Sequence, residues 1–183
     1  MMAFRKFLTL GIASIAFLVA EGSPISSSCS ETNLIQDPSF EGPKTPWINF
    51  HGALANGNSE LKARNLNNYY VANLVTTDTF ISVRQTVTDL TIGQSYALRF
   101  WYGLGTNQQF KGDICILSAT IDGSVVGKEI NLLPSPVGRY QLAERTFVAD
   151  ATSKVVRFEF NCGSTIGEVD ALLDNISLVA TCP

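Results

Sequence analysis

Apolar and polar residues alternate along most of this chain, and this alternation is the feature that most constrains its fold. In residues 80–87, one side of an extended chain would carry Ile81, Val83, Gln85 and Val87, while Ser82, Arg84 and Thr86 would lie on the other. Successive side chains of a β-strand point to opposite sides, so the alternation predicts half-buried strands. It recurs in residues 96–102, 113–121 and 155–162. No segment shows a convincing helical period.

Turn signals separate these segments at intervals of about 8–12 residues, a spacing typical of antiparallel sandwiches. Asp122-Gly123, for example, is expected to join its two flanking strands as a hairpin. We therefore predict an all-β fold, an antiparallel β-sandwich, in a single domain over residues 33–182. The expected strands are 33–35, 46–50, 69–75, 80–87, 96–102, 113–121, 125–132, 140–148, 155–162 and 170–180, with a Gly/Asn loop at 52–58.

The N-terminus resembles a secretory signal peptide, which we place at residues 1–22. Arg5 and Lys6 precede an uncharged apolar run over residues 7–20, and small residues follow at the expected cleavage position. The alternative is a membrane anchor, but the run is shorter than the roughly 20 residues that span a bilayer. We expect a secreted protein, extracellular or in a cell wall, that begins with a short leader at residues 23–32.

Charge argues against nucleic acid and anionic membranes as partners. Removing residues 1–22 leaves 13 − 2 = 11 basic and 16 − 1 = 15 acidic residues, a net charge of −4. Binding to phosphate backbones or anionic lipid surfaces needs the opposite balance. We expect a monomer with neither kind of partner.

Four cysteines remain after cleavage, namely Cys29, Cys115, Cys162 and Cys182. An even number in a secreted chain predicts two disulfides with three alternative pairings. The simplest pairs the outer two and the inner two, and both inner cysteines fall on the apolar side of their strands. Metal binding by cysteine is the weaker interpretation, because the chain has no Cys-x-x-Cys spacing.

The closing segment places a carboxylate among apolar residues. In an unbroken strand, Asp174 would share one face with Leu172, Ile176 and Leu178. A buried carboxylate without a partner is very costly, so Asp174 needs a cation, a basic partner, or access to solvent.

Two motifs carry a family resemblance. Residues 33–42 read Asn-Leu-Ile-Gln-Asp-Pro-Ser-Phe-Glu-Gly, and residues 173–178 read Leu-Asp-Asn-Ile-Ser-Leu. With residues 83–87 and 93–101 between them, they resemble CenC-type carbohydrate-binding domains, relatives of families four, nine and twenty-two. Those domains are jelly rolls of the galactose-binding-like superfamily. The resemblance spans residues 33–179, and the two cysteine pairs are similar to those of secreted fungal single-domain members.

The resemblance implies a structural calcium ion between the first and last strands. The positions that match the family's ligands are Glu41 and Asp174, with backbone carbonyls as further ligands. Calcium takes 6–8 oxygen ligands, so it would neutralise the carboxylate of the closing strand. The alternatives are an ion pair with Lys62 or Arg64, or solvation at the strand end.

The same resemblance implies a non-catalytic, lectin-like module for cell-wall polysaccharide or oligosaccharide. Sugar sites combine aromatic rings with amides and charges, so we looked for outward-facing residues of these kinds. We expect the candidates from adjacent strands and one loop to lie together; an ordinary solvated sheet face is the alternative. They are Trp101, Arg99, Arg157, Glu159, Asn161 and Phe110.

Two other functions remain open at this stage. The chain could be a structural, adhesion or host-interaction protein that does not bind sugar, or an accessory module linked to a glycoside hydrolase. We expect no catalytic activity, since no Ser/His/Asp order, His-Glu-x-x-His or phosphate loop appears. Sugar binding predicts at least two aromatic rings on one concave surface. Asn175 begins a glycosylation sequon, for which we expect partial or no occupancy.

Overall fold

The computed structural model describes residues 32–56, 63–64, 67–74, 80–106, 114–163 and 169–182, and the structural statements below concern these residues. The predicted signal peptide, nearly all of the predicted leader, Cys29 and Phe110 lie outside them. Within the described residues, no helix is long and apolar enough to cross a membrane.

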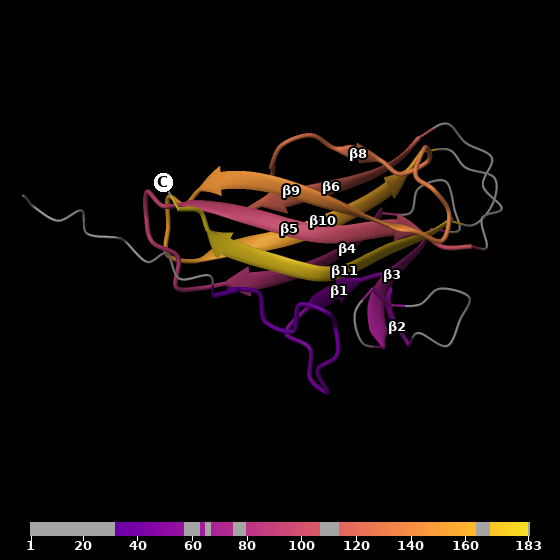
Figure 1. Cartoon of the computed structure of the whole chain (residues 1–183), viewed down its shortest axis with the longest axis horizontal. Helices are drawn as coiled ribbons and strands as arrows, with labels where there is room; N and C mark the ends of the chain where they lie inside the picture. Colours follow the sequence, from indigo (N-terminus) through magenta and orange to yellow (C-terminus); the bar gives the residue numbers. More distant parts are fainter. Residues whose placement is uncertain are drawn as a thin grey trace, which may run out of the picture.

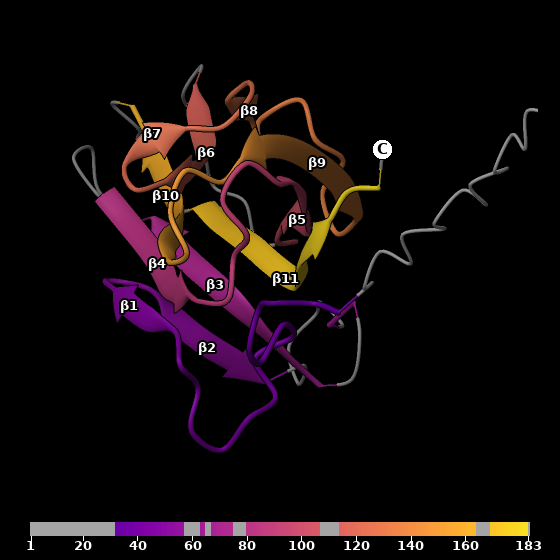
Figure 2. The ribbon, with the colours of Figure 1, turned by 90° about the vertical axis from the view of Figure 1, so that its left-hand side faces the viewer.

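The described strands form two antiparallel sheets packed face to face, which confirms the predicted all-β sandwich (Figures 1 and 2). Sheet A has the order β1-β4-β10-β6-β7, with β8 also paired to β6, and sheet B has the order β2-β3-β11-β5-β9. Sheet A consists of β1 (Ile48–Phe50), β4 (Phe80–Val87), β6 (Cys115–Ile121), β7 (Ser124–Val125), β8 (Ile130–Asn131) and β10 (Lys154–Cys162). Sheet B consists of β2 (Ala53–Asn56), β3 (Asn68–Leu74), β5 (Ser95–Leu104), β9 (Tyr140–Val148) and β11 (Val169–Ala180).

Aromatic side chains from both sheets fill the space between them. Phe100 of sheet B meets Phe158 of sheet A edge-on, with ring centroids 4.8 Å apart. The ring of Tyr70 is tilted against that of Phe160, with the two centroids 6.1 Å apart. Trp47, which leads into β1, packs on the same Phe158 and is 5% exposed, so it belongs to the core as expected. Burial of such large rings supplies much of the favourable free energy of folding.

A β-bulge in the last strand corrects one of our predictions. The pairing of β11 with β5 shifts register between Asp174 and Ser177, and Asn175 has a φ of 54°. Before the bulge, Leu173 packs in the core between the sheets; after it, Ile176 does. One extra residue reverses which residues face inward. The prediction that Leu172, Asp174, Ile176 and Leu178 share the core face is therefore wrong: Leu172 and Asp174 lie on the outer face of sheet B.

The strand boundaries differ from prediction at three places. Residues 33–35 form no strand; the Asn33 side chain bonds the last strand instead, accepting the Leu178 amide hydrogen at 2.8 Å and donating to the Ile176 carbonyl at 3.1 Å. The predicted strand 125–132 is divided into β7 and β8, with Gly127 at a φ of 73° between them. Part of the expected loop at 52–58 forms β2.

The inner disulfide is present. Cys115 and Cys162 are bonded, and they lie directly opposite each other on β6 and β10, so the bond crosses adjacent strands of sheet A. Cys182 is also disulfide-bonded. Because Cys29 lies outside the described residues, the pairing of Cys29 with Cys182 stays a prediction.

Candidate functional site

The outer surface of sheet A is a candidate binding surface, which we call the open face. The strand registers align its outward side chains in three rows across β1, β4, β10 and β6. The first row is Ile48, Arg84, Arg157 and Thr120; the second is Phe50, Ser82, Glu159 and Ser118; the third is Phe80, Asn161 and Ile116. Apolar rings and chains therefore lie beside charged and polar groups on one continuous surface.

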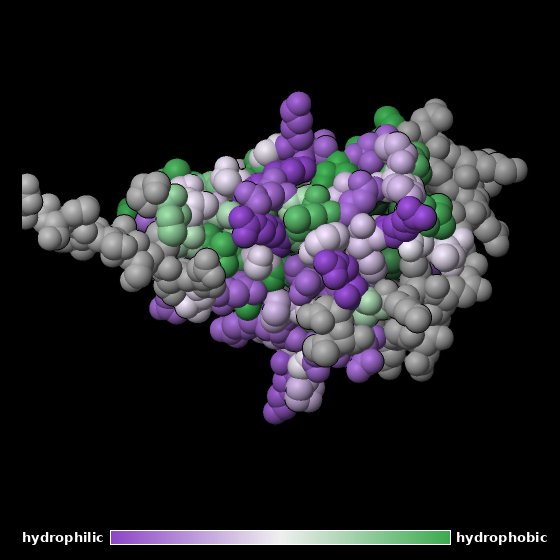
Figure 3. Space-filling model, viewed as in Figure 1, coloured by the Kyte–Doolittle hydropathy of each residue, from purple (hydrophilic) through white to green (hydrophobic). Residues whose placement is uncertain are grey.

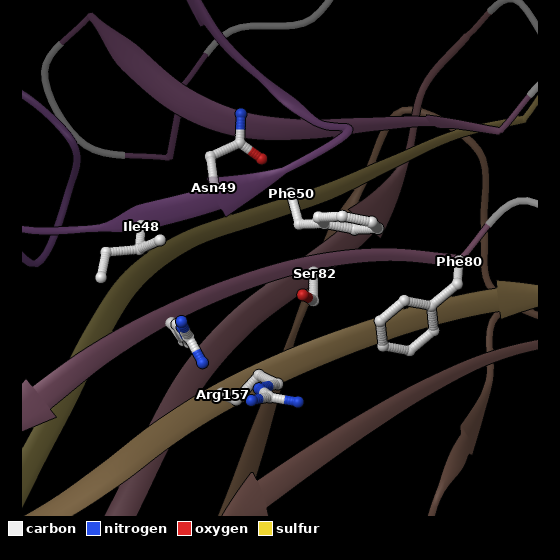
Figure 4. Close-up of a pocket in the computed structure, with 7 residues that line it drawn as sticks. Ile48, Asn49, Phe50, Phe80, Ser82 and Arg157 are labelled. Atoms are coloured by element: carbon white, nitrogen blue, oxygen red, sulfur yellow. The ribbon is translucent and has the colours of Figure 1, made fainter.

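Two adjoining hollows indent the open face. The first has a volume of about 300 Å³ and lies between β1, β4 and β10, with Ile48, Phe50, Phe80 and Arg157 at its margin (Figure 4). The second, of about 400 Å³, lies over β6 and β10 and is lined by Glu129, Glu159 and Asn161, among others. Phe80 lines both hollows, so together they offer an extended site.

Two phenylalanine rings are exposed on this surface. Phe50 is 50% and Phe80 is 38% exposed, and their ring centroids lie 6.3 Å apart. The imidazole of His51 stacks on Phe50 with a centroid separation of 4.1 Å. Exposed aromatic rings in a group, with polar neighbours, are typical of binding sites. The open face thus carries two exposed rings on one sheet face, and whether this face is the concave surface expected of a sugar-binding protein stays a prediction.

The polar groups of the open face are incompletely paired. The Arg157 Nη1 donates to Glu159 Oε1 at 3.1 Å, but its Nε is buried and has no hydrogen-bond partner within the described residues. The buried hydroxyl of Thr120, in the same row, also lacks a partner there. Buried polar groups are rarely left unpaired in native structures, so each of these two atoms is a candidate to bind an ordered water or a ligand.

The outer surface of sheet B is different, and we call it the closed face (Figure 3 shows this side of the molecule). Here the Arg64 guanidinium lies over Trp101, 3.9 Å from the ring centroid. Leu172 packs with Tyr69 in a small second core, which Ala63 and Tyr140 join. Residues that precede β3 therefore cover part of the sheet B surface that would otherwise face solvent.

Asp174 lies within this covered layer. It is fully buried, and its two oxygens accept amide hydrogens from Arg64 and Asn175, each at 2.7 Å. The nearby Tyr140 hydroxyl is buried and has no hydrogen-bond partner among the described residues. Burial raises the pKa of the Tyr140 phenol above its ordinary value, and the charge of Asp174 and the neighbouring Tyr69 raise it further.

The structure separates the residues that we expected to form one site. Arg157, Glu159 and Asn161 lie on β10 of sheet A, whereas Trp101 and Arg99 lie on β5 of sheet B. The expectation that these strands are neighbours is wrong, because β10 pairs with β4 and β6 while β5 pairs with β9 and β11. Arg99 instead forms an ion pair with Glu144 at 2.7 Å.

Sequence reasoning missed Phe50, Phe80 and Arg84, which line the first hollow. A signal for Phe80 and Arg84 was present, because both share the outward parity of Ser82 in an otherwise clear alternation. For Phe50 the signal was weaker. Its strand, β1, has only three residues, too few for alternation to identify a buried side.

The two predicted calcium ligands both accept backbone amide hydrogens from residues just before β3 or at its start. Glu41 Oε1 accepts amide hydrogens from Asn67 at 2.7 Å and Asn68 at 2.5 Å, much as Asp174 accepts that of Arg64. These contacts satisfy the two carboxylates in part without a cation. In the loop before Glu41, however, Asp37 Oδ2 is buried and has no hydrogen-bond donor within the described residues. Within those residues, no group of three or more His, Cys, Asp and Glu side chains could hold a metal ion.

The sequon asparagine lies at the bulge. Asn175 is partly buried, and its amide oxygen accepts a hydrogen bond from the Ser39 hydroxyl at 3.1 Å. An N-linked glycan would be attached to Nδ2, so this contact of Oδ1 does not decide whether the sequon is occupied, and occupancy stays a prediction.

Comparisons with known proteins confirm the fold. No protein-family profile and no curated protein sequence matches the chain. Among solved structures, TmCBM61 in complex with β-1,4-galactotriose is similar, with a TM-score of 0.61, 15% identity, and coverage of 82% of this chain and 99% of that one. The CBM22-1 xylan-binding domain from Paenibacillus barcinonensis Xyn10C gives a TM-score of 0.56 at 13% identity, covering 79% and 92%.

An enzyme has the same fold. A Stig cyclase, Fisc from Fischerella sp. TAU, has a TM-score of 0.60 at 16% identity and covers 81% of this chain and 96% of its own. At such identities the likeness shows a shared jelly-roll sandwich, and function has to be argued from the site.

Proposed function

We propose that this protein is a secreted, non-catalytic carbohydrate-binding module and that the open face binds the glycan. The observation that carries the proposal is the pair of exposed rings, Phe50 and Phe80, 6.3 Å apart beside a hollow of about 300 Å³. A pyranose ring has apolar C–H groups on its faces and hydroxyls around its edge. Phe50 and Phe80 can stack on the apolar faces, while Ser82, Arg84 and Arg157 can form hydrogen bonds with the hydroxyls.

The structural neighbours support the class of ligand. One of them, TmCBM61, is in complex with β-1,4-galactotriose, another is a xylan-binding domain, and each covers most of this chain. The disulfide in sheet A and the N-terminal sequence pattern both favour an extracellular or cell-wall protein. Together these observations favour a polysaccharide or oligosaccharide partner over the alternative of an adhesion protein that binds no sugar.

Binding to immobilised galactan, xylan, glucan and chitin tests the proposal. We expect retention on at least one of them, and at least tenfold weaker binding for Phe50→Ala or Phe80→Ala, since each loses a stacking ring. Trp101→Ala serves as the control from the closed face and should bind within twofold of the parent protein. Absence of retention on all four polymers would refute sugar binding, and loss of binding in Trp101→Ala would move the site to sheet B.

A structural calcium ion between the segment around Glu41 and the last strand, β11, remains a proposal. Glu41 and Asp174 are the residues that the family resemblance implies, and the buried oxygen of Asp37 is a further acceptor in the same loop. Carboxylate and carbonyl oxygens are the ligands that calcium prefers. Bound there, calcium would stabilise the fold and take no part in glycan binding.

A further inference from the structure

We propose that the open face selects acidic sugars, and that Arg84 and Arg157 together bind the carboxylate of a hexuronic acid residue. This inference rests on the proposed function, because it names the glycan class for the same surface. It begins from a costly arrangement in sheet A. The two arginines lie directly opposite each other on β4 and β10, and both point outward into the first hollow. Like charges at directly opposite positions destabilise a sheet.

Neighbouring acids do not neutralise this pair. Glu159 accepts a hydrogen bond from Arg157, with the two side chains 23% and 28% exposed. Arg84 forms no ion pair with any described residue. The remaining members of the same row, Ile48 and Thr120, carry no charge. Among the described residues, the first hollow is therefore lined by two cations and no acid, whereas Glu159 and Glu129 line the adjoining second hollow.

Geometry favours a planar anion as the missing partner. Guanidinium groups present two parallel N–H donors that match a carboxylate, and such charge-assisted bonds are stronger than neutral ones. The buried Nε of Arg157 has no partner among the described residues, so it can donate one more hydrogen bond. Phe50 and Phe80 line the same hollow as both arginines. A hexuronic acid fits both features, because its carboxylate projects from the edge of a ring whose face can stack on a phenylalanine.

Arg99 on the closed face shows why the open pair is unusual. Its guanidinium is 2.7 Å from Glu144, the residue directly opposite it on β9. There the strand register pairs opposite charges, as stability favours. Arg99 is thus a matched control, an exposed arginine on the other sheet whose charge is already balanced.

The test compares oligogalacturonate with its fully methyl-esterified form and with a neutral β-1,4-galactan oligosaccharide of equal length. We expect the free acid to bind at least tenfold more tightly than the ester. Arg84→Gln should abolish this preference, so that the free acid and the ester bind the variant with affinities within twofold of each other. Arg84→Lys should restore only part of it, because lysine keeps the charge but loses the paired donors. Arg99→Gln should bind all three sugars like the parent protein, and melting curves establish that each variant is folded.

The outcomes separate the two proposals. Equal binding of acid and ester would overturn the acidic-sugar inference and leave carbohydrate binding intact. A sulfated galactan that binds more tightly than the uronate would also overturn it, since sulfate and carboxylate share only their charge. If none of these sugars binds, the acidic-sugar inference fails, and retention on xylan, glucan or chitin then decides whether the proposed function survives.

Discussion

The two outer surfaces of this sandwich are built from the same alternating pattern, yet one is open and the other is covered. On sheet A, Phe50 and Phe80 are 50% and 38% exposed. On sheet B, Tyr69, Leu172 and Asp174 are 2%, 1% and 0% exposed, although all three belong to strands and point away from the central core. The difference comes from Ala63 and Arg64, which, among the residues that the structure describes, lie over sheet B.

This comparison changes how outward residues should be interpreted. Parity identifies which side of a strand a residue takes, but accessibility depends on what covers that side. Trp101 has the type and parity of a sugar platform, and Arg64 lies over its ring. A cation over an aromatic ring is worth about 0.5–2 kcal/mol, so this contact helps to hold the cover in place. The aromatic rings that a ligand can stack on are therefore Phe50 and Phe80 of sheet A.

The largest expected effect is the difference in stability between matched apolar truncations on the two faces. Leu172→Ala should lower the free energy of unfolding by about 2–5 kcal/mol, as for core residues, because it creates a cavity under the cover of the closed face. Phe50→Ala should lower it by less than about 1 kcal/mol, since half of that ring is already in water. Urea unfolding followed by intrinsic fluorescence measures both.

The opposite order of stabilities would break the comparison. If Phe50→Ala proved the more destabilising change, the open face would have a covered structure of its own and would not be a free binding surface. A small effect of Leu172→Ala would mean that the cover over sheet B contributes little.

The fold was predictable from the sequence because its main signals are local. Alternation and turn residues placed β4, β6, β9 and β10 to within two residues of their observed ends. The bulge in β11 was not predictable, because it goes with tertiary contacts: Ser39 donates to the side chain of Asn175, which has a positive φ, and the Ile176 amide donates to the Pro38 carbonyl. One inserted residue then reversed the predicted side of the sheet for Leu172, which is buried on the outer face.

The candidate site was only partly predictable, because it depends on which strands become neighbours. Sequence identified Arg157, Glu159 and Asn161 as outward-facing, and they do lie on the outer face of sheet A. It could not show that β10 would lie beside β4, with Arg84 opposite Arg157. Strand order is set by long-range packing, and period-two alternation carries no information about it.

The next effect concerns the carboxylate that anchors the cover. Asp174→Ala removes the acceptor of the Arg64 and Asn175 amides, and an unsatisfied buried donor costs about 1–3 kcal/mol. If calcium also binds there, chelation should lower the melting temperature of the parent protein, and Asp174→Ala should abolish that response. Calcium at about 100 times its Kd would add about 2.7 kcal/mol of stability.

Thermal unfolding with and without a chelator separates the two contributions. Asp37→Asn is the matched variant. It removes the charge of a carboxylate whose Oδ2 is buried in the loop before Glu41, and it leaves the hydrogen bonds from the Arg64 and Asn175 amides to Asp174 in place. A chelator that changes nothing in the parent protein would mean that contacts within the protein, among them the Arg64 and Asn175 amides, balance Asp174 without calcium.

The smallest effect concerns the ion pairs at the start of β10, where solvent weakens the interactions because both acidic partners, Asp122 and Asp150, are exposed. Lys154 contacts Asp122 at 2.8 Å and also Asp150. The Lys154 ammonium, followed by the Val155 amide, holds the pKa of Asp122 below its ordinary value. A carboxyl group whose pKa is lower in the folded state stabilises the protein above its unfolded pKa of about 4 and loses this contribution as pH falls through the folded pKa.

The variant Lys154→Met should therefore differ from the parent protein only slightly in melting temperature near pH 7, since exposed ion pairs contribute little. That difference should shrink as pH falls below about 4, where both aspartates take up protons. At the alkaline end, the same contacts raise the pKa of Lys154, so its contribution should be lost as pH rises beyond the ordinary lysine value of about 10.4. A large, pH-independent loss would show that Lys154 stabilises the start of β10 by packing instead of charge.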